Sequence, residues 1–583
     1  MWEELLENVN KPGRYIGQEW NIPGKDFCRA PLQCVLAFPD VYEIGMSNLG
    51  IRILYGILNS LQGVSCERVF CPETDMEEQL RKGREKLFSL ETKRPLGAFD
   101  ILGFSLGYEL CYTNVLRMLE LADIPLNALQ RTNQHPLVIG GGPCVMNPEP
   151  LHAFFDLFII GEAEEAIVEL LRIYQQHKEA YRAGTLSKED LLLYCAKVEG
   201  VYVPSLYQVR YTSEGRIAEY QPLRENIPAK VKKRFVKDLN ASYFPVSWLV
   251  PYIQIVHDRI FLEVTRGCPN RCVFCQARSQ YFPYRQRAPQ EVLRLAEEAY
   301  QCTGYEEIAV GGLSMSDYTH IEELLRQLVD RFQERAVGIS LPSLKAKSLV
   351  GGLSSVMARI RKAGLTFAPE AGTVRLRELL AKDFIEEEFF QALTKAYAAG
   401  YQHIKLYFMI GFPFEEEADL EAIVDFSLRA SEARKQFGKG GALVNVSLST
   451  LIPKPHTSLQ WSAMESLQRI KEKQSYVRMK NKYRKLQFSF HNPPMSFLEG
   501  VLSRGDRRLS EVILRAHQAG ARFDAWSNHF QFGIWQKAFE EEGIDPEFYL
   551  RQIPLESTLP WDIIDVGISK ETLRGECGVS SSA

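Results

Sequence analysis

Three cysteines within eight residues constrain this chain more than any other feature. They are Cys268, Cys272 and Cys275, and their spacing is C-x3-C-x2-C. Soft thiolate ligands grouped in this way select an iron–sulfur cluster or zinc. Zinc sites usually combine two separated pairs of ligands, and the sequence has no partner pair of the C-x2-C or H-x3-H kind. The motif therefore favours an iron–sulfur cluster.

The residues around the cysteines predict a strand that leads into an active-site loop. The apolar run Ile260–Val264 is followed by Thr265-Arg266-Gly267 and then by the first cysteine. The next cysteine in the chain is Cys302, so no fourth thiolate lies nearby. One iron of a cubane would then lack a protein thiolate and stay open to a small molecule. Strand, glycine turn and ligand loop is a layout typical of α/β barrels.

The C-x3-C-x2-C motif, with the aromatic Phe274 before its third cysteine, resembles the radical S-adenosylmethionine (SAM) superfamily. The resemblance implies that Cys268, Cys272 and Cys275 bind a 4Fe-4S cluster whose fourth iron is chelated by SAM. It also implies reductive cleavage of SAM to a 5′-deoxyadenosyl radical, with an electron donor such as flavodoxin or ferredoxin. Phe274 is either a contact to the adenine or a plain barrel-wall residue.

Further motifs follow in the order that the resemblance implies. Gly311-Gly312 would meet the methionyl amino group, although Leu313 stands where the family usually has glutamate; the alternative is a tight turn. Glu370, in Ala-Pro-Glu-Ala-Gly, would contact SAM, because Thr373 is the more natural cap of the next helix. Gly411 would lie in the adenine-contacting segment.

Two other polar side chains in these segments are candidates for ligand contacts. Arg375 could help to bind the SAM carboxylate. The stretch Pro453–Thr457 resembles the branch of the superfamily that joins this barrel to a cobalamin-binding domain, and also the methylthiotransferases. It contains His456, and a lone histidine is more often structural than catalytic. Its position on a rim loop leaves a substrate role open.

The first third of the chain carries three fragments that resemble a cobalamin-binding domain. Asp40 and Gly45 keep the D-x-H-x-x-G spacing, but Tyr42 takes the histidine position; Ser105 and the pair Gly140-Gly141 follow. In this order, ahead of the cysteines, they resemble an uncharacterised bacterial family of cobalamin-binding radical SAM proteins. Phenol is a poor cobalt ligand. Cobalamin would thus bind without a protein ligand, which favours methyl transfer, or the domain has lost the cofactor and positions substrate.

Apolar runs alternate with helical stretches in two parts of the chain. Fully apolar strands between helices predict a parallel, doubly wound sheet in the first part, and ligands of such sheets bind at the carboxyl ends of the strands. The six runs of the second part are too few for an eight-fold barrel and fit the open (β/α)6 barrel that the resemblance implies. The runs are Cys34–Phe38, Ile101–Ser105, Leu137–Gly140 and Leu157–Ile160, then Ile260–Val264, Glu307–Val310, Gly338–Leu341, Leu365–Ala368, His403–Phe408 and Val444–Leu448.

We therefore predict an α/β chain with a mainly helical C-terminal region. Its parts are a leader (1–30), a cobalamin-binding-like Rossmann domain (31–180), a hairpin and linker (181–250), the radical SAM core (251–461) and the helical region (462–583). The basic stretch Lys230–Arg234 in the linker is interpreted as solvated.

Composition and charge limit the partners and the cellular compartment expected for this chain. The net charge of -4 gives no general signal for binding polyanions, and no run approaches the ~18 apolar residues of a membrane helix. Scattered cysteines without a signal peptide predict a reducing cytoplasm.

The predicted function is that of a radical SAM enzyme, most simply a cobalamin-dependent methyltransferase that acts on an unactivated carbon of an unknown substrate. One alternative is an RNA-modifying enzyme of the methylthiotransferase type. Only the basic stretch Lys471–Lys485 supports nucleic acid as a partner, and a solvated helix face explains it as well. A second alternative is a sensor that binds cluster and corrinoid without turnover, against which the intact SAM motifs argue.

Overall fold

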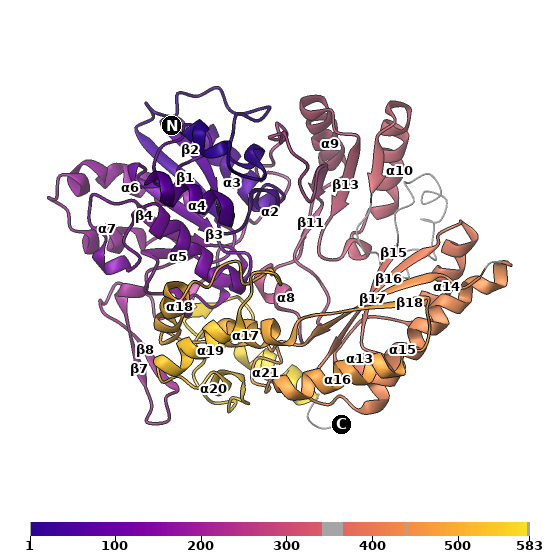
Figure 1. Cartoon of the computed structure of the whole chain (residues 1–583). Helices are drawn as coiled ribbons and strands as arrows, with labels where there is room; N and C mark the ends of the chain where they lie inside the picture. The colour runs from indigo at the N-terminus through magenta and orange to yellow at the C-terminus, as the bar shows by residue number, and fades with distance from the viewer. Residues whose placement is uncertain (1, 341–364, 439, 580–583) are drawn as a thin grey trace.

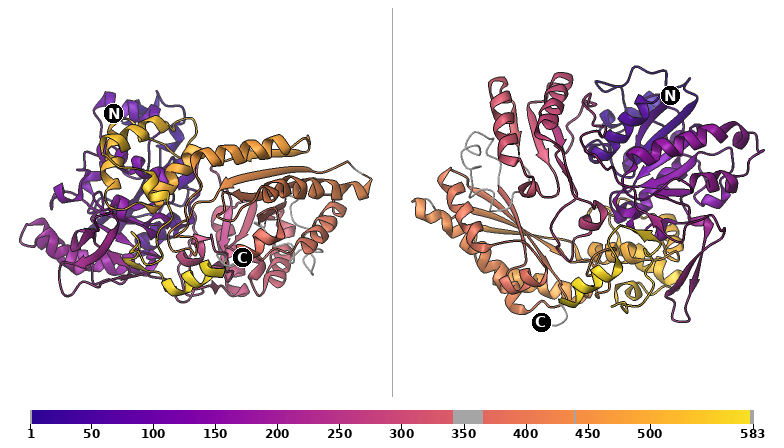
Figure 2. Two further views of the ribbon diagram at one scale, coloured as in Figure 1. Left: turned by 90° about the horizontal axis from the view of Figure 1, so that it is seen from below. Right: turned by 180° about the vertical axis from the view of Figure 1, so that it is seen from behind.

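The computed structural model describes residues 2–340, 365–438 and 440–579. Figure 1 shows a front domain at the upper left and a barrel on the right, with the C-terminal helices beneath the front domain. The view from behind in Figure 2 shows that these last helices lie against the front domain and reach the barrel. Within the described ranges, no helix is both long and apolar enough to span a membrane.

The front domain is built on a six-stranded sheet with the order β2-β1-β3-β4-β5-β6. Strands β1 to β5 are parallel, and β6 runs antiparallel to β5. The strand order reverses direction between β1 and β3, and ligands of doubly wound sheets bind at such a switch point. The strands are β1 (Leu32–Phe38), β2 (Val64–Phe70), β3 (Ile101–Ser105), β4 (Leu137–Gly141), β5 (Leu157–Ile159) and β6 (Val201–Tyr202). The helices are α1 (Trp2–Leu6), α2 (Tyr42–Gly45), α3 (Leu49–Ser60), α4 (Thr74–Gly83), α5 (Tyr112–Leu121), α6 (Ala163–Arg182) and α7 (Lys188–Cys195).

Strand β2 has no counterpart among the predicted runs, because charged residues interrupt it. All seven of its residues are nevertheless buried. Arg68 pairs with Glu19 of the leader at 2.7 Å and with Glu91 at 2.7 Å. A buried charge is tolerated when it is paired in this way, so β2 can pair with β1 through its whole length.

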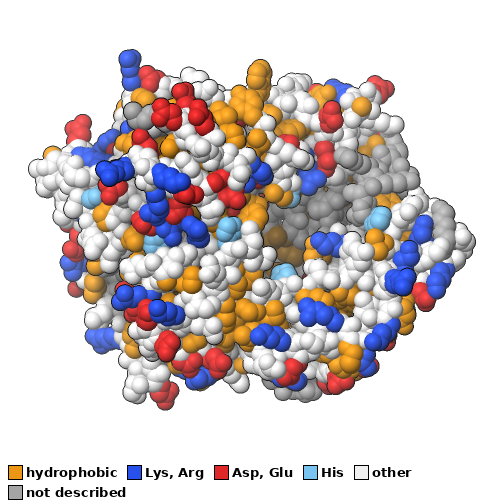
Figure 3. Space-filling model, viewed as in Figure 1, with side chains coloured by type: hydrophobic (Ala, Val, Ile, Leu, Met, Phe, Trp, Pro, Cys, Tyr) orange, Lys and Arg blue, Asp and Glu red, His pale blue; other side chains and the backbone are white. Residues whose placement is uncertain are grey.

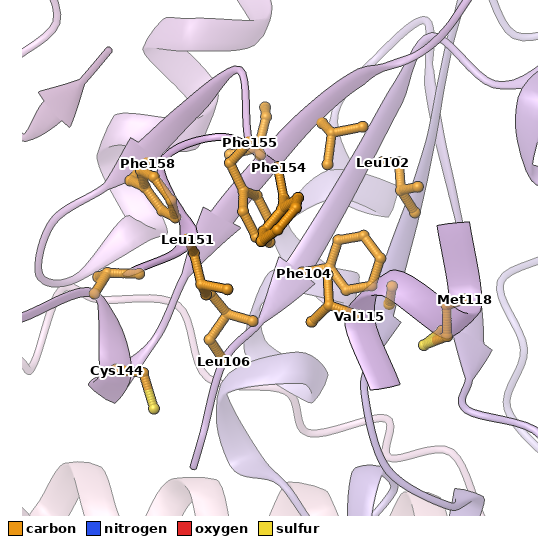
Figure 4. Packing of buried hydrophobic residues seen from close by; sticks show 14 of the residues in the cluster. Leu102, Phe104, Leu106, Val115, Met118, Cys144, Leu151, Phe154, Phe155 and Phe158 are labelled. Carbon is orange, nitrogen blue, oxygen red and sulfur yellow. The ribbon is translucent and has the colours of Figure 1, made fainter. Parts of the chain in front are cut away.

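The core of the front domain is rich in aromatic side chains. Phe104 meets Phe155 edge-on with the ring centroids 5.8 Å apart, and Phe155 meets Phe158 at 4.9 Å. Figure 4 shows these rings with Leu102, Leu106 and Leu151 around the ends of the strands. Each such ring that leaves water contributes about 1.5–3 kcal/mol, so these rings stabilise this edge of the sheet.

The barrel consists of two parallel sheets, β10-β13-β14 and β15-β16-β17-β18. Its strands are β10 (Ile260–Glu263), β13 (Glu307–Gly311), β14 (Gly338–Ser340), β15 (Leu365–Glu370), β16 (His403–Ile410), β17 (Leu443–Thr450) and β18 (Leu486–Phe490). Its helices are α9 (Pro289–Thr303), α10 (Ile321–Phe332), α13 (Val374–Leu379), α14 (Glu386–Ala398), α15 (Glu417–Glu432) and α16 (Leu467–Lys480). The predicted fold class is confirmed. Leu341, the last residue of one predicted strand, lies outside the described residues.

The barrel continues beyond Trp461, where the sequence predicts that it ends. Helix α16 leads back to β18, which pairs in parallel with β17, so one more βα unit follows the six that are predicted. The sequence hides this unit because the basic helix dominates the composition there. On that helix Lys473 is buried and contacts Glu415 and Glu465, both at 2.8 Å, which is an intramolecular role.

The C-terminal region shares a hydrophobic core with the front domain. Strand β19 (Ile564–Asp565) pairs in parallel with β9 (Val231–Lys232) of the linker, which also contains the hairpin β7 (Tyr207–Tyr211) and β8 (Ile217–Pro222). The helices are α17 (Pro493–Arg504), α18 (Leu509–Gln518), α19 (Phe532–Glu541), α20 (Glu547–Leu550) and α21 (Lys570–Val579). The C-terminal region therefore packs on the front domain and also pairs with the linker.

Candidate functional site

The three cysteines lie on a loop at the carboxyl edge of the barrel, next to β10. Strands β11 (Thr265–Arg266) and β12 (Arg285–Gln286) pair in antiparallel fashion and close this loop. Gly267 begins it with φ +86°, and a Cβ there would lie 2.6 Å from the carbonyl oxygen of Tyr281. Only glycine fits so close an approach with a positive φ. Residues 267–284 are called the cysteine loop below.

The thiols of Cys268, Cys272 and Cys275 are free and half-buried. Burial raises the pKa of Cys272 to about 11, against the opposing charge of Lys382, and burial also raises the pKa of Cys275. Metal binding requires thiolates, so it competes with these protons. Asn270 donates to the sulfur of Cys268 at 3.3 Å. No three His, Cys, Asp or Glu side chains in the described part of the chain are arranged to hold a single metal ion.

Glu370 ends β15 beside the cysteines. Its charge acts on the pKa of both Cys272 and Cys275, and its Oε1 accepts a hydrogen bond from Lys382 at 3.2 Å. Burial raises the pKa of Glu370, and Lys382 offsets part of this rise. The backbone at Glu370 has φ +69°, a conformation that costs a non-glycine residue energy and is common at functional sites. Lys382 is a member of this group that the sequence analysis missed, because no motif marks it.

The glycines predicted to contact SAM are all explained by close packing within the protein. A Cβ on Gly311 would lie 2.1 Å from the ring of Phe261, and one on Gly312 would lie 2.0 Å from the hydroxyl of Thr265. Gly411 has φ +91°, and its amide donates to Glu415 at 2.9 Å. Their contacts with a ligand remain predictions.

Phe274 is partly buried among the side chains at the ends of β15 and β16. It meets Phe412 at 6.4 Å between ring centroids, edge-on, and packs against a small apolar cluster that includes Leu376 and Leu451. This is a wall position beside the cysteines. Whether the ring also contacts adenine remains a prediction.

Two polar side chains are engaged elsewhere. Arg375 pairs with Asp419 at 2.5 Å. Thr373 caps α13 by accepting a hydrogen bond from the amide of Leu376, as predicted. His456 is buried, its Nε2 lies 3.1 Å from the carbonyl oxygen of Met146 in the front domain, and burial lowers its pKa to about 4. These residues hold segments together, so the ligand roles considered for them lack support from the geometry.

A pocket of about 340 Å³ opens at the carboxyl edge of the front sheet, between the sheet and the cysteine loop. Its lining is largely apolar and includes Leu36 and Ile139, together with the predicted Ser105 and Gly140-Gly141. Gln280 and Tyr281 of the cysteine loop line the other side. The volume lies in the range of small-molecule sites, and the position is the switch point between β1 and β3.

The first predicted cobalamin fragment lies outside this pocket. Tyr42 is 2% exposed and donates to Glu19 at 2.9 Å, and burial raises its pKa. Asp40 accepts a hydrogen bond from the indole of Trp526 at 3.0 Å, and Gly45 packs against the ring of Phe70. The spacing resembles that of a ligand loop, but long-range partners that the sequence does not reveal bury these side chains.

Buried ion pairs join the front domain to strands β11 and β12, which flank the cysteine loop. Arg266 contacts Glu164 at 2.6 Å and Glu263 at 2.7 Å, and Arg285 contacts Glu162 at 2.6 Å. Burial acts to raise the pKa of Glu162, but hydrogen bonds from Arg285 and the charge of Arg266 hold it below the usual value. Arg266, directly before the cysteine loop, thus both lines the pocket and pairs with the front domain.

The outer surface in Figure 3 has acidic and basic side chains interspersed over the face shown. This agrees with the small net charge of -4. Nucleic acid as a partner remains a prediction.

Two families match this chain. "Radical SAM proteins, N-terminal" matches residues 50–204, and "Radical SAM superfamily" matches residues 262–427. An uncharacterized protein of Methanocaldococcus jannaschii is 27% identical over 510 residues, which are 87% of this chain and 97% of the relative. The ribosomal protein methylthiotransferase RimO of Pelotomaculum thermopropionicum is 26% identical over 207 residues, 33% of this chain and 44% of its own length.

Solved structures with a similar arrangement share little sequence with this chain. The radical SAM methyltransferase TsrM from Kitasatospora setae, with cobalamin and a [4Fe-4S] cluster bound, has 14% identity and a TM-score of 0.46, with 71% of each chain covered. The cobalamin-dependent SAM radical enzyme OxsB, with aqua-cobalamin and SAM bound, has 12% identity and a TM-score of 0.46, with 94% of this chain and 78% of OxsB covered.

Proposed function

Because the chain belongs to the radical SAM superfamily, we propose that it cleaves SAM reductively at a 4Fe-4S cluster and uses a corrinoid in the front domain to methylate an unactivated carbon. One observation carries this proposal. Arg266, Gln280 and Tyr281, at the foot and within the cysteine loop, also line the front-domain pocket. Two cofactors that act on one carbon must lie close together, and a shared wall meets that need.

The cysteine loop offers a donor set that suits the cluster. Cys268, Cys272 and Cys275 supply three thiols on one short loop, and thiolates are the ligands that such clusters use. The nearby ammonium of Lys382 favours the thiolate of Cys272. When bound, the cluster supplies an electron to SAM and the corrinoid supplies a transferable methyl group.

The chain's own groups would bind and orient SAM beside the cysteines. Glu370 is proposed to contact SAM, because Lys382 holds its carboxylate next to Cys272. The backbones of Gly311-Gly312 and Gly411 would approach the methionyl and adenine parts. Phe274 would cover the adenine from the barrel wall and exclude water from it.

The front pocket suits the nucleotide tail of a corrinoid. Its volume of about 340 Å³ is too small for the whole cofactor, and its lining is largely apolar, which suits a buried aromatic base. The lining residues that the structure describes include no histidine, and Tyr42 is buried against Glu19. The corrinoid is therefore proposed to bind without a protein ligand to cobalt.

An external reductant has to deliver the electron. We propose flavodoxin or ferredoxin for this role and a reducing cytoplasm as the setting. Free thiols at all the cysteines for which the structure describes a side chain support such a setting.

Anaerobic reconstitution with iron, sulfide and hydroxocobalamin tests the proposal. The protein is expected to hold about four irons, to retain cobalamin through gel filtration, and to release 5′-deoxyadenosine and S-adenosylhomocysteine from SAM under dithionite. Cys302→Ser, which removes a thiol outside the loop, serves as the matched control. Four-iron protein that leaves SAM intact would refute SAM cleavage, whereas SAM cleavage without retained cobalamin would refute only the corrinoid part.

A further inference from the structure

A lysine of the linker lies at the centre of the junction between front domain and barrel. Lys233 directly follows β9 and is 3% exposed. Its ammonium donates to three carbonyl oxygens, those of Ser279 at 2.9 Å, Gln280 at 3.0 Å and Phe282 at 2.6 Å. An ammonium has three N–H donors, so each one has its own acceptor. The interpretation of this stretch as solvated is wrong for Lys233, because long-range contacts bury it, whereas Lys230 and Lys232 are exposed.

The three carbonyls belong to the cysteine loop. Ser279 and Gln280 are the last residues of α8 (Gln276–Gln280), and the cap at the other end of this helix is Cys275. Carbonyls at the end of a helix lack partners within it, and a cation is favoured there. Lys233 therefore fixes one end of a short helix whose other end is a cluster ligand.

The backbone of Lys233 is itself held from two sides. Its amide donates to the carbonyl of Asp565 at 2.8 Å, and the next amide, of Arg234, donates to Ile160 at 2.9 Å. Gly161 approaches so closely that a Cβ there would lie 2.7 Å from the Cγ of Lys233. The anchor of the lysine is thus the front sheet on one side and the C-terminal region on the other.

We propose that Lys233 is a positioning residue that sets the cysteine loop, and with it the cluster, against the front-domain pocket. The inference rests on the proposed function in that it takes Cys268, Cys272 and Cys275 as the cluster ligands. Gln280, whose carbonyl Lys233 holds, also lines the pocket. One contact therefore connects the pocket wall with the loop that carries the ligands.

The neighbouring lysine provides a matched control. Lys232 has a side chain that is 64% exposed, and its ammonium lies 3.6 Å from Glu199 at the surface. Lys232→Met and Lys233→Met therefore change the same residue type to the same product, one residue apart. Only the second removes the three bonds to the cysteine loop.

The test compares the reconstituted full-length variants. For Lys233→Met, we expect iron loss to a chelator to become about tenfold faster than in wild type, as is typical when the groups that orient metal ligands are removed. We also expect a changed electron paramagnetic resonance spectrum of the reduced cluster with SAM. Lys232→Met should match wild type in both measurements, and Lys233→Gln, which keeps two donor hydrogens, should fall between.

The same measurements can overturn the proposal. It is wrong if Lys233→Met and Lys232→Met lose iron at the same rate and have the same spectrum. If Lys233→Met does not fold, as judged by thermal unfolding, Lys233→Gln decides by the same criteria. Wild-type protein that takes up no cluster would instead refute the proposed function, so the two failures can be told apart.

Discussion

The front sheet and the barrel present the carboxyl ends of their parallel strands at one junction, and the two edges offer different chemistry. The barrel edge has ionisable groups, namely the three cysteines, Glu370 and Lys382. The front edge has a largely apolar pocket with glycines in its wall. A ligand at the barrel edge would be held by metal bonds and charge, and one at the front edge by shape and exclusion of water.

Because the chemistry of the two edges differs, a substitution at one site should leave ligand binding at the other site intact. Changes at the barrel edge should abolish the cluster and leave corrinoid binding intact, and changes in the pocket should do the reverse. Only residues of the shared wall should affect both. Four substitutions test this separation, in order of decreasing effect.

The largest effect is expected for Cys272→Ala. A missing thiolate leaves one iron without its ligand, so the protein should hold little iron and form 5′-deoxyadenosine more than ~1000-fold more slowly, a barrier rise of about 4 kcal/mol. Iron analysis and product quantification check this. Cobalamin retention should equal that of wild type, and its loss together with the cluster would contradict separate sites.

Glu370→Gln is expected to weaken SAM binding about tenfold to a hundredfold. The change removes a buried charge that is paired with Lys382, and hydrogen bonds to charged groups contribute about 1.5–3 kcal/mol. Equilibrium dialysis with the four-iron protein measures the affinity. The exposed Glu378→Gln on α13 is the matched control, and equal affinities of both variants would remove Glu370 from the site.

Gly141→Val is expected to weaken hydroxocobalamin binding about tenfold, because the added side chain takes up pocket space and each 1.4 kcal/mol lost changes affinity by this factor. The position can take a side chain, since a Cβ there has its nearest neighbour at 3.8 Å. Visible-light titration gives the affinity. Gly97→Ala, with open space around it, is the control, and a simultaneous loss of iron would show that the pocket is not separate.

The smallest functional effect is expected for Tyr42→Phe. It removes the hydrogen bond to Glu19 and should lower the free energy of unfolding by about 1–2 kcal/mol. Denaturant titration measures this loss. Cobalamin affinity should not change. A clear drop in affinity would show that Tyr42 belongs to the ligand site, as its spacing suggests.

Features set by neighbouring residues were predictable from the sequence. The cysteine motif and the apolar run before it are continuous in the sequence, and Thr373 caps α13 through an amide three residues further on, so the local sequence reveals them. The parallel arrangement of the strands also followed from the alternating apolar runs and helices. Signals of this kind need no knowledge of the tertiary structure.

Features set by distant partners were not predictable. Strand β2 has the charged residue Arg68, whose acids Glu19 and Glu91 lie far away in sequence. Lys233 looks like part of a solvated run until its three carbonyl partners are known. Tyr42 keeps a motif's spacing but faces the interior. In each case, tertiary contacts decide whether the side chain is buried or exposed, and the local sequence does not distinguish these alternatives.

The packing of the C-terminal region on the front domain also bears on how this chain is made. Trp526 donates a hydrogen bond to Asp40, and Asp524 accepts one from Thr113 of the front domain, yet these partners are 486 and 411 residues apart in the sequence. At ~5–20 residues per second, the domain that is synthesised first waits roughly 20–100 s for these partners. The contacts between the front domain and the C-terminal region are therefore completed long after the front sheet itself has been synthesised.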